Sequence, residues 1–432
     1  MSRKLVLWLA VLIPNGIAFL SFALPQTFEG QLEETYFKAP DFPPPTQIPV
    51  TQNPSPLNRT MTATQTTPEG PVPSQSGGPI PSTVPMPPPS PEATQPQPQA
   101  SFASTGITWI NSRPLTMEQL RGKVVMIDFW EYTCINCIRT LADNKKWYER
   151  YRGDGFVLIG VHDPEFNIAY SVKNVREAVK RFGITYPVVV DDKFMIWNLY
   201  HSNSWPNRFL IDAKGYVRYH RVGEGGDSAF EHAIQKLLQE AHPGLKFPTS
   251  YDVPPEENAF SPACGVTTPE MYVGDWFGRG VLENPEGYQD GKTVDYKAQD
   301  SVEDGHVVLE GKWRTEKDGM TYRGKKGSQG AELMLKYHAR ELYSVMNVAH
   351  GHPERVYITQ DGKDLTQKNK GVDVRFDSQG HSYLEVREPR MYYLVQNPSF
   401  GSHTVILKPS APGITINSFT FGNNCQTNFP HL

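Results

Sequence analysis

One stretch of this chain constrains its fold more than any other, because a strand of the buried type is followed directly by two closely spaced cysteines. Residues 124–130 form a continuous apolar run with one acid, Asp128, which predicts a strand covered on both faces. Cys134 and Cys137 come next, and apolar residues then recur at helical spacing over 138–148. Two cysteines at this spacing in the first turn of a helix share one face. The stretch therefore predicts a strand, a turn that can close a small disulfide ring, and a helix.

The position of Cys134 indicates which sulfur is reactive. Unpaired N–H groups and the helix dipole at a helix N-terminus favour a thiolate, so we expect the thiolate form of Cys134 to be favoured. Haem attachment would need histidine after the second cysteine, and residue 138 is isoleucine. A structural zinc site would need a second ligand pair, but Cys264 and Cys425 lie far along the chain and far from each other. The pattern favours dithiol redox chemistry, and we expect neither a metal nor a cofactor.

The length and charge of the chain limit its organisation and its partners. A chain of 432 residues exceeds one ordinary domain, which predicts two domains plus non-globular sequence. The 42 basic and 46 acidic side chains nearly balance, and no basic stripe of the kind that follows phosphates is present. Nucleic acid is therefore not an expected partner.

The first 24 residues predict export. Arg3 and Lys4 precede an uncharged, mainly apolar stretch over residues 5–24, as in a signal peptide. Small residues at 21–23 offer a cleavage site, yet twenty apolar residues are also long enough to span a bilayer. A cleaved signal and a membrane anchor both stay open, and either one places the rest of the chain outside the cytoplasm, in the periplasm or cell envelope.

A proline-rich segment over residues 25–104 separates this leader from the first predicted domain. Residues 40–98 hold 19 of the 38 prolines, with serine, threonine and glutamine between them and almost no charge. Such a composition cannot bury a core. We expect a disordered, extended linker.

The first folded domain is predicted over residues 105–245. Strands are expected over 124–130, 156–162 and 186–190, a hairpin over 208–219, and helices over 172–182 and 228–241. Thr116 and Gln119 form a capping-box pattern that predicts a further short helix ending at Gly122. Strands that alternate with helices and close with a hairpin and a helix indicate an α/β sheet of mixed direction.

A second domain is predicted over residues 264–432, after a linker over 246–263. Short alternating strands with glycine turns, about eight in all, indicate an all-β jelly-roll sandwich. Cys264 and Cys425 bracket this domain, and in an oxidising compartment we expect a structural disulfide between them. Exchange of one of them with the Cys134–Cys137 pair is the alternative.

Five aromatic residues of the second domain could offer stacking surfaces for sugar rings, which makes a glycan a candidate partner. They are Trp276, Trp313, Tyr322, Tyr343 and Tyr392. Aromatic residues in a β-sandwich more often pack in its core, so both interpretations stay open.

Several motifs resemble those of one known family. Residues 130–141, 205–215 and 223–226 resemble the extracytoplasmic thioredoxin domain of DipZ-type proteins, which are relatives of the TlpA group. Residues 268–274 and 419–422 resemble the domain that follows thioredoxin in these proteins, whose fold is similar to carbohydrate-binding modules. The resemblance implies an α/β thioredoxin fold followed by an all-β domain.

The resemblance also implies roles for individual residues. Cys134 matches the attacking thiol, and Cys137 matches the resolving thiol. Pro206 matches the cis-proline beside the pair, and Asp128 matches a buried acid whose raised pKa would let it exchange a proton with Cys137. The alternative for Asp128 is a strand-end residue that faces water. Ala142 stands where the family usually has proline, which predicts a straighter active-site helix.

The implied function is a thiol-disulfide oxidoreductase that acts on exported protein disulfides, in cytochrome c biogenesis or in redox homeostasis. A separate membrane reductase would supply electrons, and residues 135–136 lack the histidine that would favour an oxidant, so the direction of electron flow stays open. A peroxiredoxin-like antioxidant protein is one alternative, but that family has threonine or serine where this chain has Glu131. A glycan- or cell-wall-binding protein with an accessory thioredoxin domain is the other. Glu131 and His162 are further candidates at the active-site surface.

Overall fold

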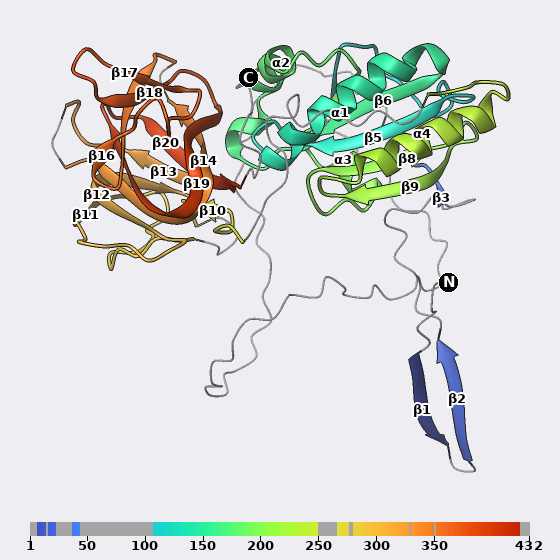
Figure 1. The fold of residues 1–432 in the computed structure, drawn as a ribbon, viewed down its shortest axis with the longest axis horizontal. Helices are drawn as coiled ribbons and strands as arrows, with labels where there is room; N and C mark the ends of the chain where they lie inside the picture. The colour runs from blue at the N-terminus through green and yellow to red at the C-terminus, as the bar shows by residue number, and fades with distance from the viewer. Residues whose placement is uncertain are drawn as a thin grey trace, which may run out of the picture. The chain divides into compact units, whose positions relative to one another are not determined.

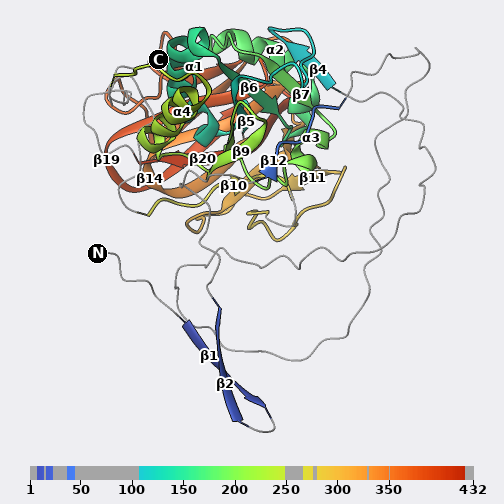
Figure 2. The same ribbon diagram turned by 90° about the vertical axis from the view of Figure 1, so that its right-hand side faces the viewer.

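The computed structural model describes residues 7–13, 16–22, 37–43, 107–248, 266–275, 280–327, 330–349 and 351–423 (Figures 1 and 2). The described residues all belong to one compact unit. Most of the predicted proline-rich linker, the predicted Cys264–Cys425 disulfide and Trp276 lie outside the described residues. These expectations stay predictions.

The predicted leader contains two paired strands. β1 (Leu7–Ile13) and β2 (Gly16–Phe22) run antiparallel, with Leu7 opposite Phe22. Among the described residues, no helix has both the length and the apolar character needed to cross a membrane. The signal or anchor over residues 1–24 therefore stays a prediction.

A seven-stranded sheet forms the centre of the first domain, which we call the redox domain (residues 107–248). Its strands lie in the order β3 (Phe37–Lys38), β9 (Tyr216–Val222), β8 (Asn207–Ile211), β5 (Val124–Trp130), β6 (Phe156–His162), β7 (Val188–Asp191) and β4 (Ile107–Ile110). β5 pairs in parallel with β6 and antiparallel with β8. The mixed α/β sheet predicted from the sequence is confirmed.

Helices cover both faces of this sheet (Figure 1). The helices are α1 (Ile135–Tyr151), α2 (Val172–Arg181), α3 (Met195–Leu199) and α4 (Asp227–Ala241), with short 3₁₀ turns at Arg152–Asp154 and Asn167–Tyr170. α1, α2 and α4 pack in the cluster that contains Met126 and Trp130 of β5, while α3 packs in the cluster that contains Ile127 and Phe129. All seven residues of β5 are buried, as a strand covered on both faces requires. The turn that contains Cys134 therefore follows directly from a strand in the middle of the core.

The capping-box prediction is only half right. The side chains of Thr116 and Gln119 exchange hydrogen bonds with each other's backbone N–H, at 3.0 and 3.2 Å. Residues 117–122 nevertheless form turns and no helix, because the chain enters β5 at Val124 before a second helical turn can form. The cap is present without the helix.

Residues 37–43 belong to the redox domain, although the sequence placed them in the linker. Phe37 and Lys38 add β3 to the edge of the sheet beside β9, and Phe42 packs edge-on against Trp109 at 5.2 Å between ring centroids. Asp41 accepts a hydrogen bond from the backbone N–H of Met117. Phe42 gives this segment enough apolar surface to dock, which the proline-rich composition around it concealed.

Eleven strands of the described residues form the second domain, which we call the β domain (residues 266–423). They are β10 (Met271–Tyr272), β11 (Thr293–Tyr296), β12 (Val307–Glu316), β13 (Gly319–Tyr322), β14 (Glu332–Val348), β15 (Glu354–Gln360), β16 (Lys363–Asp364), β17 (Val374–Phe376), β18 (Ser382–Val386), β19 (Arg390–Pro409) and β20 (Ile414–Gly422). Every pairing between these strands is antiparallel. The predicted all-β domain is confirmed, and the jelly-roll assignment stays a prediction.

The aromatic residues proposed for sugar stacking are core residues wherever the structure describes them. Trp313, Tyr322, Tyr343 and Tyr392 each expose 1% or less of their surface. A sugar ring needs an exposed aromatic face, which none of these four side chains offers. Strand alternation places Trp313, Tyr322 and Tyr392 inside the domain, while the redox domain covers Tyr343. The expected glycan site is not supported.

Candidate redox site

The two cysteines lie at the start of α1, where the strand-to-helix transition places them. Cys134 is the N-cap residue of α1, and its sulfur accepts a hydrogen bond from the backbone N–H of Cys137 at 3.3 Å. Cys137 is fully buried, Cys134 is half-buried, and both are free thiols. α1 continues through Ala142 without a break. Cys134 is therefore the cysteine that a client disulfide would approach first, and Cys137 lies behind it in the core.

The acidity of Cys134 differs from the sequence expectation. Burial raises the pKa of the Cys134 thiol, although the hydrogen bond from Cys137 opposes that shift. Burial also raises the pKa of Cys137 well above its usual range. A helix N-terminus favours a thiolate, but loss of water around the sulfur outweighs it here. Burial thus disfavours the thiolate form of both cysteines.

Pro206 lies on the loop that faces Cys134. The peptide bond between Trp205 and Pro206 is cis, and the Cys134 sulfur lies 3.9 Å from the Trp205 carbonyl oxygen. The Trp205 ring packs against Trp197 of α3 at 4.7 Å between centroids. This packing fixes the backbone beside the reactive sulfur, where an extended client chain could bind.

Asp128 is buried behind the cysteine pair and does not face water. Its side chain is fully buried in β5, where one carboxylate oxygen accepts a 2.8 Å hydrogen bond from Asn144 and the other has no hydrogen-bond partner among the described residues. Burial raises the pKa of Asp128 to about 7, and the nearby charge of Arg208 limits the rise. The Asp128 charge in turn raises the pKa of Cys137. An acid that titrates near neutral pH beside a buried thiol can give or take its proton.

Sequence reasoning missed two residues that set the environment of Asp128. Arg208 lies directly opposite Asp128 in the β5–β8 register, is fully buried, and binds Asp227 at 2.8 Å. Asn144 reaches Asp128 from α1, sixteen residues further along the chain. The sequence signal for Arg208 was a charged residue at the start of a predicted hairpin. The contact between Asn144 and Asp128 could be predicted only after α1 had been placed on the sheet.

Glu131 and His162 are buried side chains and not part of the active-site surface. Both have no exposed area, and His162 Nε2 lies 3.7 Å from Glu131 Oε1. Glu131 also accepts a hydrogen bond from the backbone N–H of Thr133 at 2.6 Å. The His162 ring stacks on Tyr132. Glu131 and His162 therefore stabilise the turn before Cys134 from inside the core.

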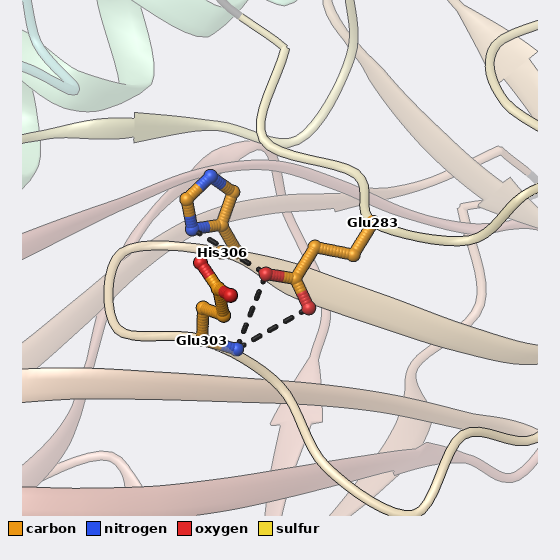
Figure 3. A group of neighbouring side chains, drawn as sticks. All are labelled: Glu283, Glu303 and His306. Atoms are coloured by element: carbon orange, nitrogen blue, oxygen red, sulfur yellow. Dashed lines mark hydrogen bonds and ion pairs between the residues drawn. The ribbon is translucent and has the colours of Figure 1, made fainter. Parts of the chain in front are cut away.

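A second group of titratable side chains lies in the β domain (Figure 3). Glu283, Glu303 and His306 offer ligand atoms within 4.8 Å of one another, and His306 Nδ1 lies 3.6 Å from Glu283. Glu303 is exposed, and the other two are partly exposed. Exposed carboxylates commonly gather without an ion, and no further feature of the described residues points to a ligand here. We assign this group no role in the function.

Comparisons with protein families match both domains. Residues 99–220 match the AhpC/TSA family, and residues 268–422 match the family described as thioredoxin like C-terminal domain. The first match contains Cys134 and Cys137, and the second covers the β domain.

Individual relatives extend these matches. Protein DipZ of Mycobacterium bovis is 33% identical over 330 residues, which are 73% of this chain and 42% of that protein. The chain therefore spans less than half the length of this relative. Thiol-disulfide oxidoreductase ResA of Bacillus cereus is 28% identical over 131 residues, 30% of this chain and 73% of that protein. The crystal structure of a thiol-disulfide isomerase from Corynebacterium glutamicum is 25% identical, covers 30% of this chain and 90% of that chain, and gives a TM-score of 0.29.

Proposed function

We propose that this chain, a homologue of DipZ among the thioredoxin-like thiol-disulfide oxidoreductases, uses Cys134 and Cys137 to exchange disulfides with exported proteins. One observation carries the proposal above the others. A half-buried thiol caps the helix and accepts the N–H of a fully buried second thiol, with an acid of pKa about 7 behind them. This arrangement suits a two-step exchange.

In the first step Cys134 gives up its proton to the solvent, from which the departing client sulfurs are later protonated, and the Cys134 thiolate attacks one sulfur of a client disulfide. A bond forms between the two sulfurs, the client's own S–S bond breaks, and its second sulfur leaves as a thiolate. In the second step Asp128 takes the proton of Cys137, and the Cys137 thiolate attacks Cys134. The client leaves with two thiols, and the protein keeps the disulfide and has lost two electrons.

Return to the dithiol needs two electrons from a donor, and we propose a membrane reductase as that donor. Export of the chain, predicted from residues 1–24, places the exchange in the periplasm or cell envelope. We propose apocytochromes that await haem, or extracytoplasmic peroxidases, as clients. The similarity to DipZ and ResA supports a role in exchanging the disulfides of proteins.

A peroxide-consuming protein is the second candidate, and the AhpC/TSA match favours it. In peroxiredoxin-like proteins threonine or serine stands three positions before the reactive cysteine. Here that position holds Glu131, whose fully buried side chain turns to Thr133 and His162. A carboxylate in that place disfavours the second candidate.

A paired assay separates the two candidates. With dithiothreitol as the electron donor, the full chain is expected to accelerate insulin reduction at least tenfold over dithiothreitol alone. The same protein is expected to consume hydrogen peroxide at the rate of the dithiothreitol blank. Turbidity at 650 nm and peroxide electrodes follow the two reactions. Rapid peroxide consumption without insulin reduction would replace the proposed function with the second candidate.

A further inference from the structure

The β domain contacts the redox domain at the residue that follows the reactive cysteine. Ile135, the first residue after Cys134, is 3% exposed. It is buried in a cluster, here called the contact cluster, that both domains build: Ile135, Phe166, Tyr272, Tyr343, Val345, Met391 and Tyr393. In an isolated redox domain the dipeptide between the two cysteines would be part of the surface that a client meets. Here another part of the same chain occupies it.

The β domain uses the outward face of its sheet for this contact. Tyr343 pairs with Tyr393, and Val345 with Met391, across β14 and β19. Tyr392, between Met391 and Tyr393, points into the core of the β domain, as strand alternation requires. An outward-facing apolar stripe of this kind is normally exposed to water, yet Met391 and Tyr393 are each only 9% exposed. The stripe is covered because the active-site turn packs on it.

Directed polar contacts surround the apolar ones. The hydroxyl of Tyr272 donates to Glu165 of the redox domain at 2.6 Å, and Asp318 accepts the backbone N–H of Asn167 at 2.7 Å. Arg181 of α2 pairs with Glu388 at 3.1 Å. These contacts fix one orientation of the β domain at the cysteine pair, which a nonspecific apolar contact would not do.

The same contacts affect Cys134 itself. Burial raises the pKa of the Cys134 thiol, and the negative charges of Glu165 and of Glu270 in the β domain raise it further. Cys134 nevertheless keeps partial exposure. Part of Cys134 therefore stays at the surface beside the β domain.

We propose that the β domain is the selectivity element of the redox site: the contact cluster excludes disulfides on folded proteins and leaves Cys134 open to small disulfides and to those on extended chain segments. The inference rests on the proposed disulfide exchange and adds to it the class of client. Trp205, whose backbone carbonyl oxygen lies 3.9 Å from the Cys134 sulfur, is the neighbour that we expect such a segment to meet. Exported proteins that have not yet folded present their disulfides in this way, and so does insulin, a small two-chain peptide whose chain ends open readily.

Two substrates with one leaving group test the proposal. One is the mixed disulfide of thionitrobenzoate with glutathione, and the other is its mixed disulfide with a folded single-cysteine ubiquitin. Reduced full-length protein releases thionitrobenzoate from either, and absorbance at 412 nm gives both rates. The selectivity, defined as the glutathione rate divided by the ubiquitin rate, is expected to exceed ten in the unchanged protein.

Two double variants weaken the contact cluster in different ways. Met391→Ala with Tyr393→Ala truncates the apolar stripe, and Tyr272→Phe with Asp318→Ala removes the two hydrogen bonds without emptying the cluster. Each is expected to lower the selectivity at least fivefold through a faster ubiquitin reaction. Tyr383→Ala is the matched control, because Tyr383 is a β-domain tyrosine on β18 with 8% exposure that lies outside the contact cluster. It is expected to leave the selectivity unchanged.

The outcomes separate this inference from the function on which it rests. Unchanged selectivity in the Tyr272→Phe/Asp318→Ala protein, with circular dichroism and melting temperature like those of the parent, would overturn the selectivity role and leave disulfide exchange standing. A parent protein that reacts with neither substrate would refute the proposed exchange itself, and the selectivity role with it.

Discussion

Replacing Cys134 by serine is expected to abolish disulfide exchange, while replacing Cys137 by serine is expected to stop the reaction halfway. Cys134 is the half-buried sulfur at the helix N-cap, so a client disulfide meets it first. Cys137 is fully buried and can attack only Cys134, three residues away. Insulin reduction should therefore fall to the rate of the dithiothreitol blank in both variants, and only Cys137→Ser should accumulate a covalent complex with its client.

Intact mass spectrometry distinguishes the two variants. The Cys137→Ser protein, mixed with oxidised insulin, should gain the mass of an insulin chain, and dithiothreitol should remove that mass. The Cys134→Ser protein should gain none. Thr140→Ser is a matched control on the same helix, because its hydroxyl can keep the hydrogen bond to the Cys137 carbonyl. A stable complex on Cys134→Ser and none on Cys137→Ser would reverse the two assigned roles.

Asp128→Asn is expected to slow resolution by about a hundredfold at pH 7, within the usual range for loss of a general acid or base. Asparagine keeps the shape of the side chain and its neighbour Asn144 but cannot take the proton of Cys137. The parent rate should show an inflection near pH 7, where burial places the pKa of Asp128, and the variant should lack it. Quenched-flow trapping of the mixed disulfide measures this step alone. An inflection that persists in Asp128→Asn would assign it to another group.

The same substitution is expected to stabilise the fold at high pH. Burial raises the Asp128 pKa from 3.8 to about 7, so between these pH values the folded protein binds more protons than the unfolded chain. Ionisation of Asp128 then costs stability as pH rises from about 4 to 7, by about 4 kcal/mol at 1.36 kcal/mol per pH unit. Asp128→Asn should remove this loss. Its advantage over the parent should be near its full size at pH 8 and smallest below pH 4.

Urea unfolding of the reduced proteins at pH 4 and pH 8 measures this difference. The comparison isolates Asp128, because other buried acids such as Asp163 titrate in both proteins. Asp154→Asn, in the short turn after α1, is the control for the loss of one carboxylate elsewhere in the same domain. An equal effect of Asp128→Asn at both pH values would show that the carboxyl is already ionised or never ionises in the folded protein.

Most of the redox domain could be predicted from local patterns. β5 and β6 lie where continuous apolar runs predicted them, because a strand that is buried on both faces is apolar at almost every position. α2 and α4 follow their apolar faces to within about two residues. β5 carries Asp128 and leads into the cysteine pair at the start of α1, so the candidate site was visible before the structure.

The features that escaped prediction all depend on contacts between distant parts of the chain. Phe42 docks from a segment whose composition indicates disorder, and Asn144 meets Asp128 only when α1 lies on the sheet. The pKa of Cys134 depends on burial that local sequence does not show. Tyr393 had no local signal for its place beside Ile135, because that contact joins two domains.

The measurement that tests the central claim most directly is a redox titration of the Cys134–Cys137 pair in the full chain. Protein equilibrated in glutathione buffers is alkylated and digested with trypsin, and the peptide over residues 124–139, which holds only these two cysteines, is weighed. We predict one reversible two-electron transition. Its reduction potential should be about −270 mV if the pair acts as a reductant and about −120 mV if it acts as an oxidant. A peptide that keeps two free thiols across the whole range would contradict the assignment of Cys134 and Cys137 as a redox-active pair.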